Sequence, residues 1–281
     1  MGWFVDKNEC IRNSIIWCDS RAVETGDIAF KQLGYDYCST HLLNAPGNFT
    51  ASKLAWVKKH EPKVYERIKA VMLPGDFIAL QLTGAITTTI PALSEGIFWD
   101  FKQQQIAEPL FQSLGIESSL IPEIRDVFSV HGVLKKESAV ALNLLEGIPV
   151  TYKAGDQQNN ALSLNVLQPG EVATTAGTSG VIYGVTDTLI HDKDFRINSF
   201  AHVNYTKTEN RIGALLCING AGIFNKWIKQ ITACNSYYEL NELAATVEPG
   251  SNGLFMYPFG NGIERMLKNK VVGAQIEAIE S

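Results

Sequence analysis

The sequence predicts an α/β protein of two domains, and three observations support this prediction. The chain has 281 residues, whereas one ordinary domain has roughly 150. Hydrophobic residues make up 46% of the chain and charged residues 19%, which is typical of a globular protein. Segments that favour strands alternate with segments that favour helices, as in a sheet covered by helices. The composition changes near residue 170, so we place the two domains at residues 1–172 and 173–281.

The first half of the chain is predicted to begin with a β-hairpin and to continue mainly as helices. Residues 2–5 and 10–17 are rich in apolar and β-branched side chains, and polar residues between them favour a turn. The segment 76–82 is compatible with a strand or a helix and ends in a Leu-Thr-Gly turn. Apolar side chains at helical spacing predict four helices, over residues 20–34, 50–60, 62–71 and 104–114.

The second half alternates short strands, glycine turns and helices. Strands are expected over residues 127–134 and 147–155, on either side of a helix over 137–145. Residues 173–187 are rich in glycine and threonine and favour a hairpin. Residues 215–231 favour a strand, a glycine turn and a helix.

The composition also excludes several classes of protein. A net charge of -5 argues against a general nucleic-acid binder, which usually has a basic surplus. The five cysteines are odd in number and show no two-residue gap, so we expect free thiols in a reducing compartment. Proline, glycine and aspartate interrupt the longest apolar segments, and the histidines show no metal-ligand spacing. We therefore expect a cytoplasmic protein with no membrane or nucleic-acid partner and no metal site of its own.

Asp156 is the strongest catalytic candidate that the residues alone provide. It lies in the segment Ala-Gly-Asp-Gln-Gln, directly after a predicted strand and a glycine. A carboxylate at the carboxyl end of a strand in an α/β layer faces a crevice, where it can accept a proton from a substrate hydroxyl. Gln157 beside it could hydrogen-bond a second hydroxyl. The alternative is a polar turn in which Asp156 caps the next helix, and spacing alone favours that alternative.

Two glycine-rich turns could approach a ligand. Residues 174–180, Thr-Thr-Ala-Gly-Thr-Ser-Gly, could offer N–H and hydroxyl groups to phosphate oxygens, but they also fit an ordinary hairpin. Gly220 and Gly222 lie between a predicted strand and a predicted helix. They could let a ligand reach the helix N-terminus, or they could simply allow close helix–strand packing.

A third motif, Trp-Cys-Asp-Ser-Arg-Ala at residues 17–22, combines an aromatic side chain with two opposite charges. Asp19 and Arg21 are two residues apart, so they share one face of the predicted strand. They could form a surface ion pair. They could also hold the hydroxyls of a polyol, with Trp17 as an apolar wall.

Taken in order, these segments resemble the FGGY carbohydrate kinases. The resemblance extends from residue 17 to residue 227 and includes the segments at 48–62, 71–84 and 169–172. Lys53 and Trp56, on one predicted helix, are its most distinctive part. It implies an actin/hexokinase-like (ribonuclease H-like) fold of two domains, with sugar and ATP in the cleft between them. It also implies transfer of the γ-phosphoryl group of ATP to a sugar hydroxyl with Mg²⁺, and it is strongest to the members that act on D-xylulose.

The resemblance assigns roles to individual residues. Asp156 takes the place of the general base. The expected sugar-side residues are Gln157, Asn48, Trp17 and Asp19. The expected nucleotide-side residues are Thr178, Gly177, Gly220 and Gly222.

The sequence also departs from the family pattern. The Asp-Gly-Thr phosphate hairpin that begins the family is missing, and a later loop matches only at Glu264 and Arg265. We therefore expect the middle of a kinase, incomplete at both termini, that transfers phosphate slowly or not at all on its own. Open alternatives are a non-catalytic sugar-binding module, a fragment without function, and another substrate such as a different ketose, gluconate or glycerol. A homodimer is also left open.

Overall fold

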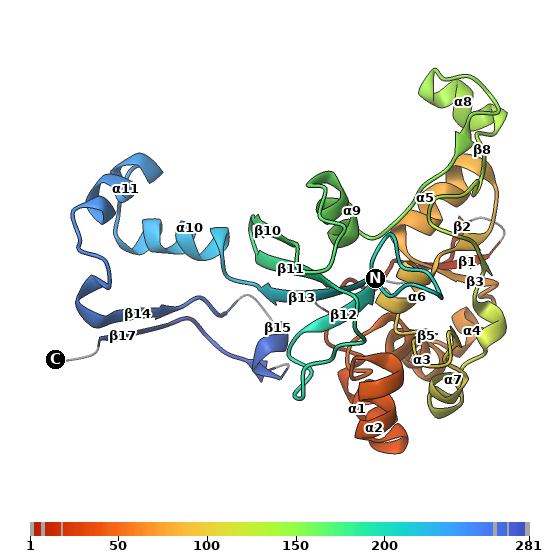
Figure 1. The fold of residues 1–281 in the computed structure, drawn as a ribbon, viewed down its shortest axis with the longest axis horizontal. Helices are drawn as coiled ribbons and strands as arrows, with labels where there is room; N and C mark the ends of the chain where they lie inside the picture. Colours follow the sequence, from red (N-terminus) through yellow and green to blue (C-terminus); the bar gives the residue numbers. More distant parts are fainter. Residues whose placement is uncertain (1–2, 7–8, 18, 261–262, 269, 279–281) are drawn as a thin grey trace.

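The computed structural model describes residues 3–6, 9–17, 19–260, 263–268 and 270–278, and it confirms the predicted α/β class (Figure 1). The fold contains two larger antiparallel sheets, one formed near the start of the chain and one in its second half. Several two-stranded sheets are separate from these two.

The first sheet has three strands in the order β2-β1-β3. β1 (Trp3–Asp6) pairs with β2 (Glu9–Cys10), which confirms the predicted hairpin, although β2 is shorter than expected. On its other side β1 pairs with β3 (Ala70–Met72), so the helix predicted over 62–71 ends early, at α4 (Pro62–Tyr65). All three side chains of β3 are buried, and this burial in the sheet outweighs the local helical spacing.

Three helices pack against one another beside the first sheet: α1 (Val23–Leu33), α3 (Thr50–His60) and α7 (Glu108–Leu114). All three were expected, and α3 has the predicted bounds. The segment 76–82, which was compatible with a strand or a helix, lies in the helix α5 (Pro74–Thr83). Its proline suits the first helical turn, and Gly84 ends it with a left-handed φ of 78°.

The second sheet has four strands in the order β10-β11-β13-β12. β10 (Val172–Ala176) and β11 (Gly180–Thr186) form the predicted glycine-threonine hairpin. β13 (Ile212–Ile218) pairs with both β11 and β12 (Asn198–Ala201). After β13 the chain turns into α10 (Gly222–Ile231), as the sequence predicted.

Shorter elements connect these parts. The helical ones are α2 (Tyr35–Tyr37), the π-helix η1 (Cys38–Leu42), α6 (Ile90–Glu95), η2 (Ser118–Leu120), α8 (Lys136–Leu142), α9 (Asp156–Ser163), α11 (Tyr237–Ala245), η3 (Ser251–Gly253) and η4 (Arg265–Leu267). The paired strands are β4 (Thr87–Thr88) with β7 (Glu123–Ile124), β5 (Trp99–Asp100) with β6 (Gln105–Ile106), β8 (Gly132–Val133) with β9 (Pro149–Val150), β14 (Leu254–Tyr257) with β17 (Gln275–Ala278), and β15 (Ile263–Glu264) with β16 (Lys270–Val271).

The main cluster of buried apolar side chains joins the two sheets. It contains Phe4, Leu54 and Trp99 from the first part of the chain and Tyr183 and Leu215 from the second sheet. The core is therefore continuous across residue 172. By contrast, Figure 1 shows α10, α11 and the β14–β17 pair extending away from the sheets at one end of the molecule. None of the described helices is long and apolar enough to cross a membrane.

Candidate active site

A cavity of about 680 Å³ lies where the starts of α3, α5 and α9 and the end of α6 face the second sheet. This volume lies within the range of small-molecule sites in proteins, roughly 300–1,000 Å³. Of the nine residues to which the sequence assigned sugar-side, nucleotide-side or base roles, four line it: Trp17, Asn48, Asp156 and Gln157. Asp19, Gly177, Thr178, Gly220 and Gly222 do not line it, although their neighbours Ser179 and Asn219 do.

Asp156 is the first residue of α9, and Gly155 is the N-cap. β9 ends at Val150, so the expectation that Asp156 directly follows a strand is wrong: irregular chain intervenes. The Asp156 carboxylate is exposed, and its Oδ1 accepts the backbone N–H of Gln157 at 2.9 Å. Within the described part of the chain no basic side chain pairs with it. It is thus available to a ligand in the cavity.

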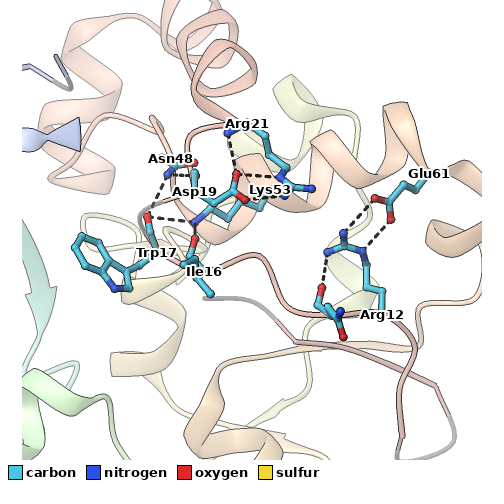
Figure 2. A network of polar contacts seen from close by, with 9 residues as sticks. Arg12, Ile16, Trp17, Asp19, Arg21, Asn48, Lys53 and Glu61 are labelled. Carbon is cyan, nitrogen blue, oxygen red and sulfur yellow. Dashed lines mark hydrogen bonds and ion pairs between the residues drawn. The ribbon is translucent and has the colours of Figure 1, made fainter. Parts of the chain in front are cut away.

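Asn48 and Lys53 fix the chain that presents Trp17 to the cavity (Figure 2). The Asn48 Nδ2 donates to the carbonyl of Trp17 at 3.1 Å and to that of Asp19. Lys53, only 1% exposed, donates from Nζ to the carbonyl of Ile16 at 2.6 Å. Asn48 Oδ1 is buried without a hydrogen-bond partner among the described residues.

Asp19 and Arg21 form an ion pair, but they do not lie on a strand as expected. Arg21 donates from Nε and Nη2 to the two Asp19 oxygens, at 2.9 and 2.7 Å. The Arg21 backbone N–H also donates to Asp19 Oδ1 at 3.0 Å, a local bond that stabilises a turn instead of a strand. These hydrogen bonds from Arg21 hold the pKa of Asp19 below its usual value. The Arg21 guanidinium lies 5.0 Å from the centre of the Trp56 ring, so Lys53 and Trp56 of α3 both fix this loop.

A buried ion pair that the sequence analysis missed borders the cavity. Lys153 Nζ lies 2.9 Å from Asp76 Oδ1 and also donates to the Thr87 carbonyl at 2.6 Å. Both side chains line the cavity, yet 5% or less of either is exposed. Asp76 and Lys153 are far apart in the sequence, so no motif with a fixed spacing could have predicted their contact.

Glu95, at the end of α6, is a second missed acid of the cavity. It lies directly against Gly155: a Cβ atom there would be 2.5 Å from Glu95 Cδ and would overlap Oε1. Burial, reinforced by the charge of Asp156, raises the pKa of Glu95 to about 7. A single acidic residue carries no chemical meaning by itself, so no local signal in the sequence could have identified Glu95.

Arg265 adds a positive charge to the cavity wall. Its guanidinium lies 4.7 Å from the centre of the Phe49 ring, and burial lowers its pKa to about 10. The described residues include no carboxylate paired with it. A partly buried cation without a carboxylate partner is costly, so this wall favours an anionic ligand. Glu264 beside it is buried and accepts the N–H of Asn219 at 3.3 Å instead.

The two glycine turns lie against each other. The N–H groups at the start of α10, those of Ala221 and Gly222, donate to the carbonyls of Thr178 and Gly177, at 3.1 and 2.8 Å. A Cβ at Gly222 would lie 2.6 Å from the Gly177 oxygen, so this glycine allows close packing. Gly220 likewise allows close packing, here against Pro258, whose carbonyl carbon would be 2.6 Å from an added Cβ. These contacts support the packing alternative for both glycines and occupy the first N–H groups of α10.

The tip of the hairpin keeps its own donors for a ligand. Within the described residues, the backbone N–H and hydroxyl groups of Thr178 and Ser179 donate no hydrogen bond to protein. Both residues lie in the turn between β10 and β11, and Ser179 lines the cavity. A turn of this kind suits phosphate oxygens. No group of three His, Cys, Asp or Glu side chains in the described ranges could hold a metal ion.

Comparison with known proteins gives the class of this fold and site. The N-terminal domain model of the FGGY family of carbohydrate kinases matches residues 2–163, more than half of the chain. The protein therefore belongs to the FGGY family of carbohydrate kinases.

Several curated relatives that the chain matches are xylulose kinases. The chain is 26% identical over 264 residues to the xylulose kinase of Haemophilus influenzae and 27% identical over 255 residues to that of Lactococcus lactis. These alignments cover 92% and 90% of this chain but 52% and 50% of the relatives. The chain thus spans about half the length of the curated relatives it matches.

Solved structures confirm the actin/hexokinase-like fold that the resemblance implied. The xylulose kinase from Lactobacillus acidophilus superimposes with a TM-score of 0.88 at 19% identity, covering 99% of this chain and 56% of that one. The gluconate kinase from the same organism gives a TM-score of 0.87, also at 19% identity and with the same coverage. At these identities the likeness concerns the fold alone.

Proposed function

We propose that the protein phosphorylates a hydroxyl group of a sugar, with ATP as the phosphoryl donor and D-xylulose as the acceptor. Membership of the carbohydrate kinase family and the names of the curated relatives support this proposal. The single observation that carries it is the cavity, where Asp156 faces the same space as Trp17, Asn48 and the hairpin tip at Ser179. Residues 1–172 would supply the sugar side and residues 173–281 the nucleotide side.

The proposed chemistry needs one base and a wall that positions the sugar. Asp156 accepts the proton of the sugar hydroxyl while the oxygen of that hydroxyl forms a bond to the γ-phosphorus of ATP. The bond between the γ-phosphorus and the β–γ bridging oxygen breaks in the same step. The products are the sugar phosphate and ADP, and the proton then passes from Asp156 to solvent. Gln157 and Asn48 would supply hydrogen bonds to other hydroxyls, and the Trp17 ring would form an apolar wall. Asp19 would act indirectly, by holding Arg21 and the loop.

The hairpin tip and Arg265 form the proposed phosphate side. The N–H and hydroxyl groups of Thr178 and Ser179 are free to donate, and the Arg265 guanidinium supplies positive charge. Gly177, Gly220 and Gly222 would keep this turn and the start of α10 in place by close packing. Mg²⁺ bound to the nucleotide would neutralise phosphate charge, and it commonly takes only one or two carboxylates from the protein.

The choice of D-xylulose rests on the curated relatives and not on the fold. A xylulose kinase and a gluconate kinase from one organism superimpose almost equally well, with TM-scores of 0.88 and 0.87. A single hydroxyl in the sugar pocket can decide between such substrates. Gluconate, glycerol and other ketoses therefore belong in the test.

The test measures sugar binding and ADP release by the 281-residue chain and by its Asp156→Asn variant. Because the chain spans half the length of its relatives, its own rate is expected to be low, so the assay needs high protein concentration. General base catalysis contributes about 10²–10⁴-fold, so sugar-dependent ADP release should fall by that factor in Asp156→Asn. The dissociation constant for D-xylulose, measured by calorimetry, should change by less than about threefold, because the asparagine keeps the shape of the side chain.

Each outcome separates the alternatives. A near-normal rate in Asp156→Asn would reject this residue as the base. Sugar binding with neither ADP release nor any effect of nucleotide would favour a non-catalytic sugar-binding module. A folded chain that binds none of the sugars tested would favour a fragment without independent function.

A further inference from the structure

Glu95 is placed to act on a ligand, although it has no part in the chemistry proposed above. It ends α6, and its carboxyl group lies against the backbone of Gly155, one residue before Asp156. Both carboxyl groups line the same cavity. Their surroundings differ, because Asp156 is exposed at the start of α9 whereas Glu95 is only partly exposed.

The hydrogen bonding around Glu95 is incomplete without a proton. Glu95 Oε1 and Gln158 Oε1 are both buried, and neither has a hydrogen-bond partner among the described residues. Both of these oxygens are acceptors when Glu95 is ionised, so neither has a donor, although the Gln158 side chain hydrogen-bonds the Glu95 carboxylate. Protonation converts Glu95 into a donor and removes one orphan acceptor.

The charges around Glu95 favour the protonated form. Burial is the main cause of its raised pKa, and the negative charges of Asp156 and Asp76 add to it. The Gln158 side chain opposes the shift through a hydrogen bond, and the phenol of Tyr183 also faces this group. No lysine or arginine among the described residues forms an ion pair with Glu95.

We propose that Glu95 is a second acid of the sugar site, which in its protonated form donates a hydrogen bond to an oxygen of the bound sugar. Asp156 and Glu95 then have opposite roles: the first accepts a proton and the second donates a hydrogen bond. Two neighbouring carboxyl groups with different environments commonly divide their work in this way. The inference rests on the proposed function, because it concerns the same cavity and the same class of ligand.

The first test is the pH dependence of D-xylulose binding, measured by calorimetry. If only protonated Glu95 donates to the sugar, the dissociation constant should rise about tenfold per pH unit above 7. Glu95→Gln keeps a donor that does not titrate, so its affinity should stay flat over the same range. Glu146→Gln makes the same change at an exposed site and should behave like the unmodified chain. Equal pH dependence in Glu95→Gln and the unmodified chain would overturn the proposal.

A second test needs no sugar, so it tests the protonation of Glu95 separately from the proposed kinase function. Carbon-13 NMR titration of the glutamate carboxyl groups should show one that titrates near pH 7 and that is absent from Glu95→Gln. If every glutamate titrates below about pH 5.5, near the ordinary value, Glu95 holds no proton at neutral pH and the inference fails. If this signal is present but no sugar binds, the proposed function fails, and the sugar contact of Glu95 fails with it.

Discussion

Replacing Lys153 by methionine should destabilise the protein strongly. Lys153 Nζ lies 2.9 Å from Asp76 Oδ1, 2.6 Å from the Thr87 carbonyl and 2.9 Å from Thr87 Oγ1. The lysine side chain is 5% exposed and the aspartate 2%, so little water reaches the intact pair. Methionine keeps most of the volume of the side chain and removes only its charge and its donors.

The size of the effect follows from what remains around Asp76. Without Lys153, the carboxylate keeps the Thr88 hydroxyl at 2.8 Å and a long contact of 3.5 Å from the Leu73 N–H. Breaking a buried pair while leaving one charge in place typically costs about 3–5 kcal/mol. If Asp76 is also replaced, by leucine, the orphan charge disappears, and most of this loss should be recovered. The pair should therefore show a coupling of about 2 kcal/mol or more in a double-mutant cycle.

Urea unfolding of the single variants, the double variant and a surface control measures this coupling. Lys58→Met is the matched control, because Lys58 forms a 2.8 Å pair with Glu117 whose side chains are 40% and 52% exposed. That variant should lose less than about 1 kcal/mol. A Lys153→Met loss equal to that of the control, or additive losses in the double variant, would refute the argument from burial.

Two further predictions concern Glu95 and the glycine turns. The folded state holds the pKa of Glu95 at about 7 against an ordinary 4.5, so its stabilising contribution is complete below pH 4.5 and is lost as pH rises past 7. The unmodified chain should lose up to about 3 kcal/mol relative to Glu95→Gln between about pH 4.5 and 8 in urea unfolding, and parallel curves would contradict this. Gly222→Ala should cost about 1–3 kcal/mol, because its Cβ would lie 2.6 Å from the Gly177 oxygen. Gly180→Ala, with its nearest neighbour at 3.5 Å, should stay within about 1 kcal/mol, and equal losses in the same assay would contradict the packing role.

The sequence predicted best the elements whose signals are local. α3 (Thr50–His60) has the expected bounds, because its apolar spacing and a proline two residues after its end both act within the segment. The hairpin of β10 and β11 was likewise encoded by its own glycines and threonines. One error came from long-range pairing: β3 is a strand only because β1 lies beside it.

The residues of the candidate site also divide into those with a local sequence signal and those without one. Motif order along the chain was enough to select Asp156, Gln157, Asn48 and Trp17, which do share one cavity. Residues that matter only through a distant partner gave no signal. Lys153 needs Asp76, and Glu95 needs Gly155, before either has a recognisable function.

Gly155 links the two acids of the proposed site. Its backbone has φ -71° and ψ 166°, an extended conformation that any residue can adopt, so a turn does not require glycine here. What requires it is Glu95, whose carboxyl group occupies the space that a Cβ would fill. The same absent side chain lets α9 begin at Asp156 while Glu95 packs behind it. The exposed acid can thus serve as a base and the shielded acid as a donor, because a single glycine keeps the two in one cavity but in different surroundings.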